Sequence, residues 1–447
     1  MATSPHTIEY ASLTDVGIRR SHNQDACATQ PAPDEAVFLS HGHVFVVADG
    51  MGGHAVGEKA SAKAIRDIPL TYQKHVAAEG PRAAIRRAVS EANAAIHQIG
   101  QNNPEFKGLG TTGSALFIRD EGAWVGHVGD SRVYRIRPGK IQQLTFDHSW
   151  VWEIARRQGV DPDELGDFKR NVIIRSLGPE AEVEVDIEGP HPVEPGDAFL
   201  LCSDGLTNHV KPDEIGAAVF AFPPSEACEF LVALANVRGG SDNITALVAK
   251  VPDRTDDTVI VRRAKKGGIL AAWKWWHKRV PWPLTCLGIG AFFVVVSIAM
   301  KIEGISGSIP MLLFVIAAFA TITGIIGLAV QMKKRIEAGA DREEDDRAGE
   351  LHVYKEYAFA IGPEMCLRFA DDETTAVKTA EDAGVEFDRA AYTAFAEAAS
   401  AAVKAGDWPA AFRNRCSALL AVAGPLNNSH RKEEAFKPNW TTPHRGA

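Results

Sequence analysis

The chain has 447 residues, with 48 Lys and Arg against 57 Asp and Glu and a formal net charge of −9 at pH 7. This length predicts roughly two to four domains, and the acidic balance argues against a nucleic-acid-binding protein. The cysteines are scattered without a CxxC or Cys/His pair, so neither a zinc knuckle nor a disulfide framework is expected. The first residues, MATSPHTIEY, have no basic segment leading into an apolar core, so no cleaved secretion signal is expected.

Residues 1–252 have the pattern of one α/β domain. Its strand-like runs are 44–48, 114–118, 123–128, 132–136, 199–202 and 244–251. Its helix-like stretches are 57–75, 81–101, 212–220 and 225–237. Because several strand-like runs follow one another through short turns, the pattern predicts mainly antiparallel sheet flanked by helices, and not a doubly wound parallel sheet.

The stretch from about 150 to 190 interrupts this pattern and is mostly polar. An insertion of this kind can act as a mobile lid over a site. It can equally be a plain surface insertion, and the residues alone leave both alternatives open.

A short apolar run, Val44–Ala48, ends on Asp49 and is followed at once by glycines, beginning with Gly50. A carboxylate at a strand end, next to residues that allow close backbone approach, suits a metal ion or a phosphate. Taken alone, Asp49-Gly50 would be better explained as an ordinary turn. The pattern is repeated, however. Comparable positions beside strand-like runs or near the start of the chain are held by Asp25, Asp130, Asp204 and Asp242.

Clusters of aspartate oxygens suit the hard cations Mg²⁺ and Mn²⁺ rather than zinc. Two such ions can share a bridging carboxylate and a water, and can lower the pKa of that water enough to give hydroxide near neutral pH. Hydroxide held in this way is placed for in-line attack on phosphorus. The sequence therefore predicts a two-metal hydrolytic centre.

Binding of the phosphate is assigned to Arg20, because a guanidinium can pair with two phosphate oxygens. Arg19 is the competing candidate. His54 is the candidate proton donor to the leaving group, with a water on a metal as the alternative. His127 and His148 are weaker candidates for that role.

Residues 253–279 are expected to form a basic linker with interleaved tryptophans. The next segment, 280–332, contains two stretches without charged residues, 280–300 and 304–332. Each exceeds the roughly 20 residues that a membrane span requires. Positive charge flanks both outer ends, so a two-helix transmembrane hairpin with both ends in the cytoplasm is expected. The alternative is a pair of long helices buried in a soluble domain.

Beyond the hairpin, residues 333–384 are expected to be a charged spacer and an irregular segment. Residues 385–426 are alanine-rich with helical periodicity, broken at Gly406-Asp407-Trp408. They faintly resemble a single tetratricopeptide unit, but a generic helical hairpin is the better interpretation. This hairpin is a candidate for binding a protein partner, and the tail 427–447 is expected to be poorly ordered at its end.

Eight blocks of residues 8–252 together form a recognisable pattern. They are TDVGIRRSHNQD (14–25), VFVVADGMGGHAVGE (44–58), GLGTTGSAL (108–116), VGHVGDSRVYRI (125–136), QLTFDHS (143–149), RNVIIRSLG (170–178), LLCSDGLTNHV (200–210) and GGSDNITALVAKV (239–251). In order and spacing they resemble the metal-dependent protein phosphatases, the type 2C serine/threonine phosphatases in their bacterial form. The resemblance implies a catalytic domain over 1–252, folded as a β-sandwich of two mainly antiparallel sheets between pairs of helices.

The resemblance also implies a role for each site residue. Asp49 would bridge two core metals, Mn²⁺ or Mg²⁺, with the Gly50 carbonyl on one of them. The remaining ligands would be Asp204 and Asp242 on one ion, Asp25 on the side of the other, and Asp130 with Asp204 on a third, weaker ion. Arg20 would bind the phosphate, and 150–190 would be the flap that influences substrate access.

One departure from the family concerns the general acid. In eukaryotic members a histidine directly follows the Asp-Gly pair, whereas here Met51 takes that place and the histidine is displaced to His54. The identity of the general acid therefore stays open.

The predicted function is a serine/threonine protein phosphatase, anchored to the cytoplasmic face of the cell membrane, acting on phosphoprotein substrates of a serine/threonine kinase. The alternative is a non-catalytic phosphatase-fold scaffold or sensor, which the complete set of aspartates argues against. A receptor subunit with phosphatase output is ranked lower, because the expected outer loop is too short to bind much.

Overall fold

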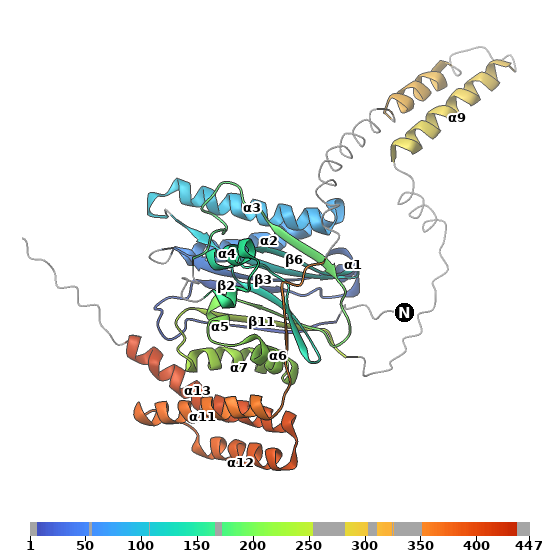
Figure 1. The fold of residues 1–447 in the computed structure, drawn as a ribbon. Helices are drawn as coiled ribbons and strands as arrows, with labels where there is room; N and C mark the ends of the chain where they lie inside the picture. Colours follow the sequence, from blue (N-terminus) through green and yellow to red (C-terminus); the bar gives the residue numbers. More distant parts are fainter. Residues whose placement is uncertain are drawn as a thin grey trace, which may run out of the picture. The chain divides into compact units, whose positions relative to one another are not determined.

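The computed structural model describes residues 7–52, 56–106, 108–165, 172–253, 282–302, 311–323, 325 and 351–435 (Figure 1). The chain divides into two compact units. The first comprises residues 1–255 and 351–447, and the second comprises residues 256–350. The first unit contains all the predicted site residues.

The first unit is built on two facing antiparallel sheets. One has the strand order β1 (Glu9–Asp15), β11 (Ile244–Lys250), β10 (Ala198–Cys202), β7 (Arg132–Arg137), β8 (Lys140–Gln143), β12 (Lys355–Ala358). The other has the order β2 (Asp25–Gln30), β3 (His43–Met51), β5 (Gly113–Arg119), β6 (Gly122–Val128), β9 (Asp186–His191), with β4 (Gly110–Thr111) also paired to β3. The two-sheet antiparallel fold expected for this part of the chain is present.

Helices cover both outer faces of this sandwich (Figure 1). The second sheet is covered by α2 (Gly57–Glu79) and α3 (Pro81–Asn102), and the first by α6 (Pro212–Ala221) and α7 (Pro224–Val237). Shorter elements are α1 (Glu35–His41), η1 (Pro104–Phe106), α4 (Trp150–Gln158), η2 (Pro162–Glu164) and α5 (Asp204–Thr207). The last three border the site described below.

The alternation of side chains along β3 explains why its sequence is continuously apolar. Phe45 and Val47 belong to the core between the two sheets. Val44, Val46 and Ala48 belong to the core beneath α2 and α3. Because successive side chains of a strand point to opposite faces, a strand covered on both faces needs an apolar residue at every position.

The C-terminal region belongs to the same unit as the sandwich. Strand β12 extends the first sheet beside β8, and it is followed by α11 (Pro363–Asp382), α12 (Arg389–Ala405) and α13 (Trp408–Ala435). The ring of Phe369 in α11 lies 5.5 Å from that of Phe230 in α7 and 5.3 Å from that of Phe412 in α13. One apolar core therefore joins the C-terminal helices to the sandwich.

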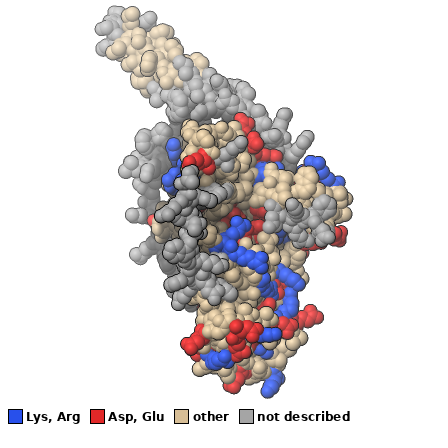
Figure 2. Space-filling view, turned by 90° about the vertical axis from the view of Figure 1, so that its left-hand side faces the viewer, with Lys and Arg blue, Asp and Glu red and all other residues tan. Residues whose placement is uncertain are grey.

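This packing differs from the sequence analysis in two respects. The segment 333–384, expected to be a spacer and irregular, contains β12 and α11; a four-residue strand is too short to leave a pattern, and most of α11 is polar. The helical hairpin 385–426 was also a candidate for binding a separate protein. Its apolar residues pack against α7 and one another, and acidic and basic side chains are interspersed over this end of the unit (Figure 2), so that expectation has no support here.

The second unit contains the segment for which a membrane anchor was predicted, and the described helices contradict that prediction. Among the residues that the structure describes, no helix has both the length and the apolar character needed to cross a bilayer. In this unit the structure describes helix α9 (Trp282–Ile302). The transmembrane hairpin at 280–332 and the multi-pass membrane location are therefore wrong. The basic linker lies outside the described residues after Asp253.

Candidate active site

Strand pairing brings the first two candidate ligands together. Asp25 begins β2 and is directly opposite Asp49, near the end of β3, in the antiparallel register. Asp25 is buried, and its Oδ2 accepts hydrogen bonds from the hydroxyls of Ser203 and Thr245, each at 2.7 Å. Thr245 is in β11 of the other sheet and Ser203 directly follows β10 of that sheet, so the two hydroxyls fix Asp25 between the two layers.

The other three aspartates stand where strands of the first sheet begin or end. Asp204 follows β10 and opens α5, and Asp242 precedes the neighbouring strand β11. Asp130 lies in the turn between β6 and β7, after Gly129, whose φ is 116°. A side chain at Gly129 would meet Thr112 at 2.6 Å, so only glycine fits this tight turn.

The electrostatics show that these carboxylates face one another. Burial raises the pKa of Asp25 to about 7, and the charges of Asp204 and Asp242 add to that rise, against the hydroxyls that lower it. Burial also raises the pKa of Asp49 well above its ordinary value, and the other four aspartates contribute in the same direction. The pKa values of Asp130 and Asp204 are raised by burial first and then by a neighbouring aspartate. Like charges crowded in this way require positive charge to become stable.

The donor atoms fit divalent cations. The Oδ1 atoms of Asp25, Asp130 and Asp204 are buried and have no hydrogen-bond partner among the described residues, an arrangement that is costly unless a cation is bound. Within the described part of the chain, no three or more His, Cys, Asp or Glu side chains form a group that could hold a metal ion. Mg²⁺ does not require three such ligands, because it is usually held by one or two carboxylates and keeps several waters.

Arg20 lies beside one of these carboxylates. Its Nη2 donates a hydrogen bond to Asp242 Oδ2 at 2.7 Å, and its side chain is half exposed. The loop that carries it is held by Asn243, whose Nδ2 donates to the backbone carbonyls of Val16 and His22 at 2.9 and 3.0 Å. Sequence reasoning did not identify Asn243, although it adjoins the predicted ligand Asp242.

Three histidines are candidates for the proton donor, and the structure describes two of them. His54 lies outside the described residues. His127 and His148 are buried and occupied elsewhere: His127 Nε2 contacts the carbonyl of Phe146 at 2.9 Å, and His148 Nδ1 accepts from the backbone N–H of Gly129 at 2.9 Å. Burial lowers the pKa of His127 to about 3, so it stays neutral and serves the core.

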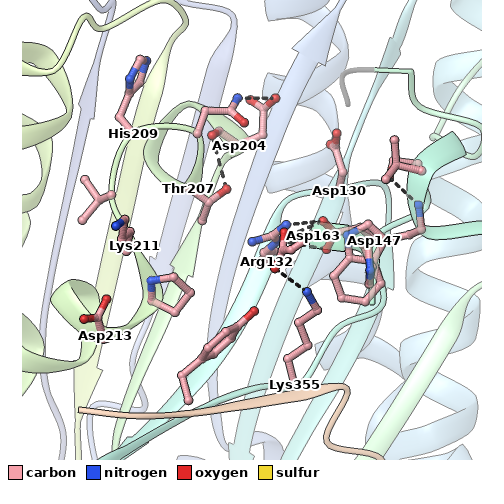
Figure 3. A pocket seen from close by; sticks show the side chains of 18 residues that line it. Asp130, Arg132, Asp147, Asp163, Asp204, Thr207, His209, Lys211, Asp213 and Lys355 are labelled. Carbon is pink, nitrogen blue, oxygen red and sulfur yellow. Dashed lines mark hydrogen bonds and ion pairs between the residues drawn. The ribbon is translucent and has the colours of Figure 1, made fainter. Parts of the chain in front are cut away.

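A cavity of about 530 Å³ adjoins the aspartate cluster, and Asp130 and Asp204 form part of its wall. Its other walls come from α4, η2, the 207–213 segment and β12 (Figure 3). Arg132, which lines the cavity, is neutralised by Asp147, which accepts from its Nε and Nη2 at 2.7 to 3.0 Å. Sequence reasoning missed the β12 residues Lys355 and Tyr357, because no motif connects them to the aspartates.

Comparison with known proteins identifies the family. The family model described as "Protein phosphatase 2C" matches residues 18–236. Protein phosphatase PhpP of Streptococcus pneumoniae is 37% identical over 247 residues, which cover 54% of this chain and 97% of that protein. Serine/threonine phosphatase stp of Listeria monocytogenes is 34% identical over 242 residues, covering 53% and 93%. The chain therefore belongs to the protein phosphatase 2C family and is a protein-serine/threonine phosphatase.

Solved structures are also similar over this part of the chain. The Mycobacterium tuberculosis serine/threonine phosphatase PstP/Ppp is 30% identical, with 55% of this chain and 99% of that one covered and a TM-score of 0.49. A second structure, the catalytic domain of PstP in complex with two manganese ions, is 31% identical with a TM-score of 0.47. The family match ends at residue 236, so the C-terminal region that includes β12 and α11 to α13 lies outside it.

Proposed function

We propose that this phosphatase hydrolyses phosphoserine and phosphothreonine in phosphoproteins with the help of divalent cations, Mn²⁺ or Mg²⁺. The observation that carries the proposal is the convergence of five carboxylates from separate segments. Burial and neighbouring aspartates raise the pKa values of four of them, Asp25, Asp49, Asp130 and Asp204. Such a cluster is unstable alone and is stabilised by hard cations. A scaffold without catalytic activity would have no use for this arrangement.

The proposed ligands of two core cations are Asp25, Asp49, the Gly50 carbonyl, Asp204 and Asp242, with Asp130 and Asp204 for a weaker third. When bound, these cations supply Lewis acidity and lower the pKa of water. Ser203 and Thr245 would keep the Asp25 carboxylate oriented. The chain itself would thus supply the orientation of the ligands and the negative charge that holds the cations.

Arg20 is proposed to bind the phosphate of the substrate. In the described state its guanidinium is paired with Asp242. A cation on Asp242 would weaken that pair and leave Nη2 available for phosphate oxygens, to which arginine binds bidentately. His54 is proposed as the proton donor to the leaving group, with solvent water as the alternative donor.

The test is cation-dependent release of phosphate from a phosphothreonine peptide by the full chain. Asp49→Asn should lower kcat/KM by about 10³-fold or more, because it removes a proposed ligand of the core cations. The matched control, Asp120→Asn, changes an exposed aspartate in the β5–β6 turn and should behave as wild type. Wild-type protein without turnover, indistinguishable from Asp49→Asn in Mn²⁺, would contradict the proposal.

A further inference from the structure

Strand β12 lies more than a hundred residues beyond the family match, yet it forms part of the cavity beside the aspartate cluster. It pairs with β8 in antiparallel register, with Lys355 opposite Gln143 and Tyr357 opposite Ile141. Lys355 and Tyr357 are two residues apart, so they share one face of the strand. Both line the same cavity as Asp130.

Lys355 connects β12 to the flap. Its Nζ lies 2.7 Å from Asp161 Oδ1 and 2.8 Å from Asp163 Oδ2, at the start of η2. The same nitrogen lies 5.2 Å from the ring centroid of Trp152 in α4. Only 11% of the Lys355 side chain is exposed. Figure 3 shows it reaching from β12 toward Asp163. A single, mostly covered ammonium therefore contacts both short helices of the flap.

The residues just before β12 hold the other end of the flap. The hydroxyl of Tyr354 donates to Glu188 Oε1 at 2.8 Å, and His352 Nδ1 lies 3.3 Å from the same oxygen. Glu188 is in β9, the strand at the C-terminal end of the flap. The segment 352–355 thus bridges the start and the end of the flap.

We propose that Lys355 is a positioning residue of the phosphatase site. By holding η2 and α4 against β12, it fixes the wall of the cavity that receives the peptide residues next to the phosphorylated side chain. This inference rests on the proposed placement of the phosphate at the aspartate cluster. A phosphopeptide extends from that cluster into the cavity, whereas a small aryl phosphate does not fill it.

Loss of the Lys355 ion pairs should change the flap locally without unfolding the protein. Asp161 and Asp163 are about half exposed, at 48% and 59% of their side chains, and ion pairs of this kind contribute little to global stability. Lys140 provides a matched control, because its Nζ lies 3.5 Å from Glu356. That pair also joins β8 to β12, but it does not contact the flap.

The experiment compares Lys355→Met with Lys140→Met in the full chain, using a phosphothreonine peptide and p-nitrophenyl phosphate in Mn²⁺. Lys355→Met should raise KM for the peptide about fivefold at nearly unchanged kcat, because it removes two ion pairs of modest strength. Activity toward p-nitrophenyl phosphate should be unchanged. Lys355→Arg should largely restore the peptide KM, and Lys140→Met should resemble wild type.

A double-mutant cycle tests whether the effect passes through the flap. Replacing Asp161 and Asp163 by Asn should raise the peptide KM as Lys355→Met does, and combining the changes should add little. If the changes in peptide KM are additive, or if activity falls equally with the peptide and with p-nitrophenyl phosphate, Lys355 has only a structural role and the proposal fails. An unchanged peptide KM would overturn the proposal outright.

Amide hydrogen exchange provides a readout that does not require activity. Lys355→Met should speed exchange across 150–165, and Lys140→Met should not. Unchanged exchange in Lys355→Met would contradict the proposed contact. If wild-type protein shows no cation-dependent turnover, the proposed function fails, while hydrogen exchange still decides on the role of Lys355 in holding the flap.

Discussion

Replacing Asp25 by Asn should stabilise the cation-free protein. The pKa of Asp25 rises from 3.8 to about 7 on folding, and about 3 pKa units correspond to about 4 kcal/mol. Between these two pH values the folded protein binds more protons than the unfolded chain, so the free energy of unfolding falls as pH rises. Above pH 7 the full cost of ionising Asp25 is present.

The net gain is smaller than this cost. An Asn oxygen can still accept from Ser203 and Thr245, which both bond to Oδ2. The amide nitrogen would replace Oδ1, which has no partner among the described residues, and an unpaired buried donor costs about 1–3 kcal/mol. We therefore expect Asp25→Asn to be more stable than wild type by about 2 kcal/mol at pH 8 in a chelator.

Urea unfolding at several pH values, with EDTA and with Mn²⁺, measures both effects. In EDTA, the decline in stability between pH 4 and 7 should be shallower in Asp25→Asn. In excess Mn²⁺ the order should reverse, because a cation at 100 times its Kd stabilises the folded state by about 2.7 kcal/mol and the variant lacks a ligand. A variant less stable than wild type in EDTA, with the same pH dependence, would refute the crowding of carboxylates.

Two further predictions concern Arg20 and His127. Arg20→Ala should raise KM for a phosphopeptide about tenfold or more. Arg20→Lys should have nearly the same high KM, because lysine cannot pair bidentately with phosphate. Calorimetric titration of Arg20→Ala should still detect Mn²⁺ binding, and loss of that binding would contradict the assignment of Arg20 to the phosphate. His127 has a pKa of about 3 in the folded protein and 6.5 otherwise, so the unfolded chain binds the extra proton between these values and stability falls as pH drops below 6.5. At pH 5 this loss amounts to about 2 kcal/mol. It should be absent from the pH dependence of His127→Gln unfolding, and an equal dependence in both proteins would rule it out.

Much of the phosphatase-like part of the fold follows from local sequence. The apolar run before Asp49 predicts a buried strand, and β3 is buried because its alternate residues face two cores. The aspartates at strand ends could be identified as a set, since their spacing matches a family pattern. Their roles as ligands stay predictions, as does that of His54. The transmembrane hairpin was wrong, because none of the helices that the structure describes has both the length and the apolar character to cross a bilayer.

The sequence by itself determined the elements of the sandwich and the chemistry of its aspartates, because side-chain periodicity and short turns act over a few residues. Only the tertiary structure decided that Arg20 pairs with Asp242 and that Asp25 lies opposite Asp49. It also decided that Lys355 reaches Asp161, 194 residues away in the chain. Such contacts depend on strand register and on packing between distant segments. Neither can be predicted from the local sequence around the two residues that form the contact.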